Sequence, residues 1–248
     1  MRDERGVVLI YMLWVAALVG LLVLWAGQRA REAVGAAEGF LRLQRARRLA
    51  LSGLSEAMVR LTVAESSKRW APDGVPRTIE MEGAKVTVVI EPEYRKININ
   101  RVKEDVLKEV LGELGLGEEL AEAILDFRDR DNAPRPKGAE EEFYQTLNPP
   151  YRPINRPFQA PEELLWVRGV DYKALYGGDH PLVDLLSPWG GRVAPPEEGE
   201  EPETDLRPGR LYRISSSALG LTLVAVVRYQ GPRGAVFTVR YLGEHYAF

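Results

Sequence analysis

Residues 5–26 read RGVVLIYMLWVAALVGLLVLWA, and no charged side chain occurs from Val7 to Ala26. About 20 residues of α-helix rise about 30 Å, which is the thickness of the hydrocarbon core of a bilayer. A secretory signal peptide would have a shorter apolar core and a cleavage site made of small residues, whereas this run is longer and ends in WAGQR. The sequence therefore predicts a transmembrane helix at residues 7–27 that stays attached to the chain.

Apolar residues continue at helical spacing beyond this run, with arginines between them. The positions that recur mostly three, four or seven residues apart are Ala33, Ala36, Phe40, Leu43, Ala50, Leu54, Ala57 and Leu61. Such a stripe predicts an amphipathic continuation of the helix over residues 28–66, which ends near Glu65. A cluster of helix breakers at residues 70–76 supports an end at this point.

β-branched residues are concentrated near both ends of the remaining chain. The stretch Thr78–Glu91 contains a β-branched run, residues 86–90, that is bounded by Gly83 and Pro92, which predicts a strand. Further strands are expected over Leu211–Ile214, Leu219–Tyr229 and Ala235–Leu242, and we expect the last two to form a hairpin.

The stretch between these strands has helical spacing. We expect one helix from an Asn100 cap to Glu113, a second from Glu118 to about Arg130, and a short helix at Pro161–Val167. Residues 131–161 are rich in proline, asparagine and acids and are expected to be irregular. Strands that flank an α-rich middle predict an α+β fold, with an α-domain inserted into a small α+β domain.

Composition excludes several classes of function. The 248 residues include 33 Lys and Arg against 36 Asp and Glu, a formal net charge of −3, so no global positive field exists to hold nucleic acid. The absence of cysteine excludes thiol catalysis, zinc–thiolate sites and disulfides. His180 and His245 have no partner at metal-ligand spacing and no neighbouring nucleophile, so neither a zinc site nor a hydrolase triad is expected.

A short charged leader ends in Gly6, directly before the membrane run. This arrangement resembles a type IV prepilin signal, in which a membrane peptidase cuts after the glycine and the new N-terminal residue, here Val7, is methylated. The resemblance implies a cytoplasmic leader and an exported body, although the arginines after the run would favour the opposite orientation. The alternative is a plain signal anchor in which Gly6 is incidental.

Four motifs follow in order along the chain: ININ at 97–100, AEAILDFRDRD at 121–131, KGAE at 137–140 and PEELLWVRG at 161–169. Together they resemble the K-type minor pseudopilin of type II secretion, the general secretion pathway protein K family. The glutamate that pilins usually carry five residues into the mature helix is replaced here by Tyr11, and the K-type family also lacks it. The resemblance implies a non-enzymatic protein at the tip of a short periplasmic pseudopilus, where no neighbouring amine would need the acid as a partner.

The resemblance also implies a pseudopilin fold, a long N-terminal transmembrane and amphipathic helix packed on a small antiparallel sheet, with an inserted α-helical domain. The expected division is a leader at 1–6, the helix over 7–27 and 28–66, the sheet from 67–95 and 206–248, an α-domain with helix-hairpin-helix-like units at 96–190, and an acidic loop at 191–205. Expected partners are the I-type and J-type minor pseudopilins, the major pseudopilin and the prepilin peptidase, at the inner membrane with the body in the periplasm and without nucleic acid. Most of the helix stripe is expected to pack in the chain's own core. The helix residues that could also contact partners are Tyr11, Phe40, Leu43, Ala50, Leu54 and Leu61.

Acids are concentrated in the irregular segment after the second predicted helix. Asp129, Asp131 and Glu140 occupy places 1, 3 and 12 of a calcium-loop count, but Ala133 and Pro134 at places 5 and 6 exclude an EF-hand. Hard oxygen ligands still suit calcium, and the K-type family is similar in having calcium sites in its α-domain. We therefore expect a structural calcium ion at these three acids. The alternative is that Asp126, Asp129 and Asp131 pair with nearby arginines and cap a helix end; these arginines are Arg128, Arg130 and Arg135.

An alternative function comes from the stretch Leu114–Gly117 and the apolar helix after it. This stretch resembles a helix-hairpin-helix, which binds DNA phosphates through the amides of a glycine turn and a helix N-terminus. A membrane-anchored DNA receptor of the competence type is therefore the alternative. Residues 98–145 carry seven basic against thirteen acidic side chains, however, and Glu118 and Glu119 lie where phosphates would approach, which opposes binding.

Overall fold

The computed structural model describes residues 4–195, 205–232 and 236–246, and it divides the chain into two units between Arg48 and Leu49. The helix α1 (Glu4–Thr62) belongs to both units and has 59 residues. It ends three residues before the expected Glu65, because the chain folds back and the Trp70 amide donates to the Arg60 carbonyl at 3.1 Å. Predicted leader residues 1–3, most of the predicted acidic loop, 196–204, and Ala235 lie outside the described residues.

Among the described residues, α1 is the one helix that is long and apolar enough to cross a membrane, and the apolar part is its first half. Its large apolar side chains from Val8 to Trp25 are all exposed. A soluble protein would bury such a face in its own core, so the exposure agrees with the predicted transmembrane helix.

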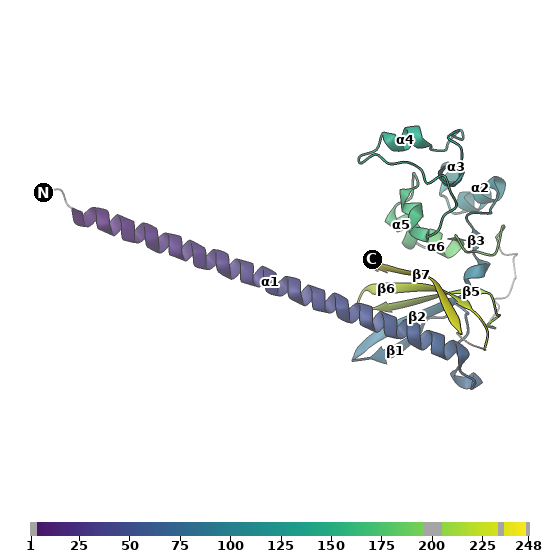
Figure 1. Cartoon of the computed structure of the whole chain (residues 1–248), viewed down its shortest axis with the longest axis horizontal. Helices are drawn as coiled ribbons and strands as arrows, with labels where there is room; N and C mark the ends of the chain where they lie inside the picture. Colours follow the sequence, from purple (N-terminus) through teal and green to yellow (C-terminus); the bar gives the residue numbers. More distant parts are fainter. Residues whose placement is uncertain (1–3, 196–204, 233–235, 247–248) are drawn as a thin grey trace. The chain divides into compact units, whose positions relative to one another are not determined.

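The second unit contains a five-stranded antiparallel sheet in the order β1-β2-β5-β6-β7 (Figure 1). The strands are β1 (Arg77–Met81), β2 (Ala84–Glu91), β5 (Leu211–Ala218), β6 (Leu221–Tyr229) and β7 (Phe237–Tyr246). With the long apolar helix and further helices, this sheet confirms the predicted α+β fold class.

Two tight turns were not predicted. The β-branched run between Gly83 and Pro92 is β2, as expected, but the stretch Thr78–Glu91 as a whole is a hairpin, whose turn residues Glu82 and Gly83 have φ angles of 50° and 72°. Leu219 and Gly220, with φ angles of 52° and 85°, likewise separate β5 from β6. Two consecutive positive φ angles are typical of the two-residue turns that match the twist of antiparallel strands.

The last four turns of α1 lie across the sheet and share a core with it (Figure 1). Leu54 and Leu61 from the helix are buried with Val88 and Ile214 from the strands. The closest approach is at Gly53, where a Cβ atom would lie 2.2 Å from Ser216 Oγ and 2.7 Å from Val86 Cγ1. The helix can lie this close to the sheet only because residue 53 has no side chain.

An α-helical insertion joins β2 to β5 and has its own core around Phe127 and Tyr144. A short η1 (Ser66–Lys68) follows α1, and η2 (Glu93–Arg95) follows β2. The helices of the insertion are α2 (Glu104–Glu113), α3 (Gly117–Arg128), α4 (Glu141–Gln145), η3 (Pro161–Trp166), α5 (Tyr172–Tyr176) and α6 (Leu182–Leu185). A parallel pair, β3 (Ile97–Asn98) and β4 (Leu186–Ser187), closes its base.

Asn100 does not cap a helix as the sequence predicted. Its side-chain amide donates to the Phe158 carbonyl at 2.9 Å, and its side-chain oxygen accepts from the Phe158 amide at 2.7 Å. Because both polar atoms are used in this way, α2 begins later, at Glu104. Asn100 therefore fixes an irregular segment of the insertion rather than a helix end.

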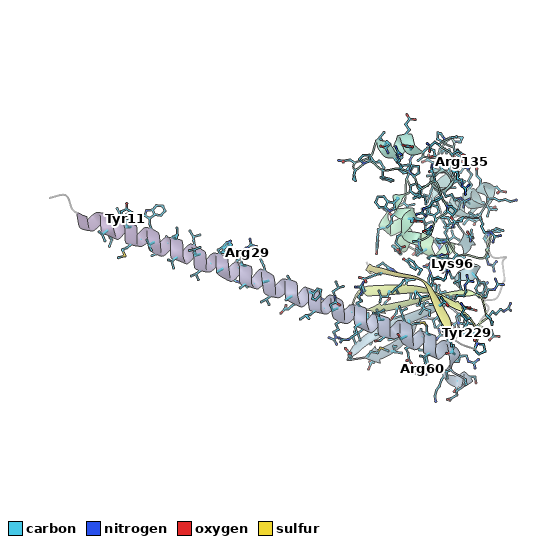
Figure 2. All side chains as sticks on the ribbon, viewed as in Figure 1. Tyr11, Arg29, Arg60, Lys96, Arg135 and Tyr229 are labelled. Carbon is cyan, nitrogen blue, oxygen red and sulfur yellow. The ribbon has the colours of Figure 1, made fainter. Side chains whose placement is uncertain are left out.

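A buried ion network joins the insertion to the sheet. Glu93 is fully buried and accepts from Arg213 on β5, Nε to Oε2 at 2.9 Å, and from Ser187 on β4 at 2.6 Å. Lys96, which lies between sheet and insertion (Figure 2), is 3.5 Å from the same carboxylate and donates to the Val183 carbonyl at 2.8 Å. A second junction is formed by two tyrosines, one from each part, that donate to Glu162; they are Tyr176 and Tyr241.

Replacing Gly53 by alanine is expected to destabilise the second unit by about 1–3 kcal/mol, because the new methyl group overlaps Ser216 and Val86. The matched control is Gly112→Ala on α2, where nothing lies within 4 Å of the new Cβ and a gain of up to about 1 kcal/mol is expected. Thermal unfolding of the detergent-solubilised chain measures both. Equal shifts of the melting temperature would contradict the close approach.

Glu93 is expected to make stability depend on pH. Burial alone would raise the pKa of its carboxyl, but the charges of Arg213 and Lys96 and the hydrogen bonds from Arg213 and Ser187 outweigh burial and lower the pKa from 4.5 to about 2. A carboxyl with a lowered pKa stabilises the folded state above its unfolded pKa, and this contribution is lost as the pH falls from about 5 to 2.

The variant Glu93→Gln should therefore lose about 3–5 kcal/mol at pH 7, because Arg213 is left buried without its counter-charge. Its stability should also change less than that of the parent between pH 5 and 2. Glu80→Gln, on the exposed face of β1, is the control and should follow the parent. Denaturant unfolding across this range measures all three, and parallel curves for the parent and Glu93→Gln would exclude this role of Glu93.

Candidate functional site

Three carboxylates gather where α3 meets the loop that leads to α4. Asp126 lies in the last turn of α3, Asp129 is its C-terminal cap residue, and Glu140 is the residue before α4. One oxygen atom from each lies within 4.8 Å of the other two, which is close enough for a single metal ion to contact all three.

Glu140 is the least compensated member of this group. Its side chain is buried, and neither carboxylate oxygen has a hydrogen-bond partner. Oδ1 of Asp129 is also buried without a partner. Burial, followed by the negative charges of Asp126, Asp129 and Asp131, raises the pKa of Glu140 to about 7. Buried carboxylates without partners are costly, so the arrangement favours a bound cation.

The loop between Asp129 and Glu140 is tied to α3 through its backbone. The Arg135 amide donates to Asp126 Oδ2 at 3.1 Å, and the Lys137 amide donates to Glu122 Oε2 at 2.6 Å. A Cβ atom at Gly138 would lie 1.9 Å from Asp126 Oδ2, so the loop lies directly against that carboxylate. These contacts hold the acids of the loop and of the helix together.

Asp131, which the sequence predicted as a ligand, lies outside this group of three. Its Oδ1 accepts from the Ala133 amide at 3.0 Å in a local turn, and its side chain is exposed. The structure brings together the predicted Asp129 and Glu140 and adds Asp126. The spacing of Asp126 and Asp129, three residues apart at a helix end, could have identified the pair, because side chains at i and i+3 share a helix face.

Carboxylate oxygens are the ligands that calcium prefers, and calcium accepts irregular geometry. The three acids of the structure therefore fit a calcium ion, which would take further oxygens from the backbone or water. A groove of about 600 Å³ opens beside Glu140 and is lined also by Asn132, Gly138 and Phe143.

The helix residues predicted to meet partners are in different environments. Tyr11 and Phe40 are exposed, and Leu43 is half-buried. The other three are buried in the chain's own core against the sheet, so their assignment to partner binding is corrected; they are Ala50, Leu54 and Leu61. Gly6 and Val7, at the predicted cleavage site, lie within α1, and their side chains are not described.

The predicted helix-hairpin-helix falls on the glycine turn between α2 and α3, where the φ angles are 71° at Gly115 and 76° at Gly117. Glu118 and Glu119 lie in the first turn of α3, where a phosphate would approach. Lys137, the nearby cation, is 3.3 Å from Glu118. The surface is therefore acidic, which argues against a DNA-binding function.

The fold is that of a pseudopilin with an added α-domain. A chain of the crystal structure of the GspK–GspI–GspJ complex from the type 2 secretion system of enterotoxigenic Escherichia coli superposes with a TM-score of 0.52 and 16% identity, over 88% of this chain and 100% of that chain. At this identity the likeness establishes the fold alone.

Sequence comparison finds relatives of one kind. A family model described as type II secretion system (T2SS), protein K, matches residues 91–183. The type II secretion system protein K of Pseudomonas aeruginosa is 29% identical over 214 residues, and that of Pectobacterium carotovorum subsp. carotovorum is 25% identical over 195 residues. The alignments cover 75% and 68% of this chain and 63% and 59% of these relatives. The predicted resemblance to the K-type minor pseudopilins of type II secretion is confirmed.

Proposed function

We propose that this chain is a minor pseudopilin that initiates and caps a type II secretion pseudopilus or a related filament, without enzymatic activity. One observation carries the proposal: an apolar helix of membrane length continues without a break into a helix that packs on a small antiparallel sheet. This combination allows one helix to serve as a membrane anchor and then as the joint of a filament subunit. The relatives named protein K support it.

The anchor is proposed to lie in the inner membrane, with the body in the periplasm. Cleavage after Gly6 by a prepilin peptidase would free Val7 for methylation and allow the helix to leave the bilayer sideways into a helical bundle. Tyr11 is neutral, so it cannot pair with the amine of a neighbouring subunit as an acid would. A subunit at the tip has no neighbour above it and does not need that pair.

The insertion between β2 and β5 supports the position at the tip. It adds a second core to the sheet that a pseudopilin needs, and its bulk would leave room for new subunits only below it. By analogy with the solved GspK–GspI–GspJ complex, the proposed partners are an I-type and a J-type minor pseudopilin, followed by the major pseudopilin. The exposed Tyr11 and Phe40 are available on the helix for such contacts.

A structural calcium ion is proposed at Asp126, Asp129 and Glu140. The support is the distance between their oxygens and the burial of Glu140 without a partner. A bound calcium ion would supply the missing counter-charge and fix the loop 129–140 on α3. Asp131 would contribute through its charge, as its effect on the pKa of Glu140 indicates.

Co-expression with a prepilin peptidase tests the proposed class. The intact mass of the membrane-purified chain should fall by residues 1–6 and rise by one methyl group. Gly6→Ala should stay uncut, because the prepilin signal that this segment resembles requires glycine before the bond. Gly20→Ala, where nothing lies within 4 Å of the new Cβ, is the control and should be processed as the parent is. An intact leader in the parent, or full cleavage of Gly6→Ala, would refute the prepilin assignment.

Calcium is expected to raise the melting temperature of the parent by several degrees, because a ligand at about 100 times its Kd stabilises by about 2.7 kcal/mol. Asp129→Asn with Glu140→Gln should abolish the rise. The control, Glu109→Gln with Glu119→Gln, removes the same charge from exposed positions of α2 and α3 and should keep it. The site is excluded if the parent shows no rise, or if both double variants lose it equally.

A further inference from the structure

A cation that belongs to the chain already lies in the carboxylate group. The Arg135 guanidinium donates through Nη1 to Asp126 Oδ1 and to Asp129 Oδ2, the latter at 2.7 Å. Its Nε donates to Glu104 Oε2 on α2 at 3.1 Å. One side chain therefore neutralises two of the three acids that the proposed calcium ion would use.

This pairing satisfies some oxygens of the three carboxylates and leaves others without a partner. Both oxygens of Asp126 are used, Oδ1 by the guanidinium and Oδ2 by the Arg135 amide. The carboxylate oxygens of Glu140 and Oδ1 of Asp129 accept no side-chain or backbone hydrogen bond. A divalent ion drawn to these free oxygens would lie close to the guanidinium and be repelled by it. Full use of the three acids therefore requires that the guanidinium leave.

The structure gives the guanidinium a way to leave without unfolding the loop. The Arg135 side chain is 27% exposed, so part of it already contacts solvent. The loop would remain attached through the Arg135 amide on Asp126 and the Lys137 amide on Glu122. Gly138 would keep its contact with Asp126. The side chain can thus move while the backbone stays in place.

We propose that Arg135 is a built-in competitor for the calcium site, which holds Asp126 and Asp129 together in the metal-free chain and is displaced when calcium binds. The inference rests on the proposed calcium site. Arg135 acts as a positioning residue: it keeps like charges from separating the loop from α3, and it weakens the affinity for calcium. The site then exchanges one counter-charge for another and stays folded in both states.

Calcium titration of the purified full-length chain by calorimetry tests the competition. Arg135→Met should lower the Kd for calcium by about tenfold or more relative to the parent, since removal of a competing charge strengthens binding. Lys137→Met is the matched control: it removes the same charge from the same loop, but its amine contacts Glu118 and not the three acids. Its Kd should change less than threefold by the same reasoning. The melting temperature of metal-free Arg135→Met should fall, while its rise with calcium should exceed that of the parent.

The outcomes separate this inference from the calcium site itself. If the parent binds calcium and Arg135→Met binds no more tightly than Lys137→Met, the competition is refuted and the site stands. If neither the parent nor Arg135→Met binds calcium, both proposals fail. If Arg135→Met binds calcium and the parent does not, the competition is supported, because Arg135 then prevents binding altogether.

A measurement on the unmodified sequence covers the case in which Arg135→Met does not fold. Phenylglyoxal reacts with accessible guanidinium groups, and peptide mass spectrometry gives the rate at each arginine. Saturating calcium should increase the rate at Arg135 several-fold and leave that of the exposed Arg101 unchanged. An unchanged or slower reaction at Arg135 with calcium bound would overturn the displacement.

Discussion

The buried carboxylate of Glu93 is the interaction on which the union of the sheet and the insertion depends. It receives hydrogen bonds from Arg213 in the sheet and from Ser187 at the base of the insertion, and it lies beside Lys96. Two cations and one anion in a fully buried place require close geometry, because each charge has lost its water. The network therefore favours the arrangement in which these three side chains meet, because any other would leave a buried charge without its partner.

Much of the fold could be predicted from the sequence, because its main elements have strong periodic patterns. The membrane run, the amphipathic continuation and the paired helices of the insertion were all evident from apolar spacing. Tight turns were missed at Glu82 and Leu219, where the residue before glycine is not one of the types that commonly adopt positive φ angles. Asn100 was misplaced because its partner, Phe158, is remote in sequence.

The candidate site was predicted in part, for a similar reason. Asp129 and Glu140 stood out as acids in an irregular segment, but Asp126 belongs to a helix whose regular pattern concealed its role. Which oxygens lack partners depends on the path of the loop and on the direction of Arg135, and neither follows from local spacing. The sequence contained the alternative of acid–arginine pairing, and in the structure Arg135 pairs with two of the three carboxylates that an ion would use.

The order of strands has a consequence for how the chain acquires its structure. β2 and β5 are neighbours in the sheet, yet residues 92–210 separate them, while β3 and β4 close the insertion upon itself. A chain that emerges from its N-terminus therefore presents the β1–β2 hairpin with an open edge until the whole insertion has followed. The insertion can complete its own core during that delay, and closing the long loop costs less entropy once its ends are held together. Once folded, the insertion thus brings β5, β6 and β7 close to the unpaired edge of β2.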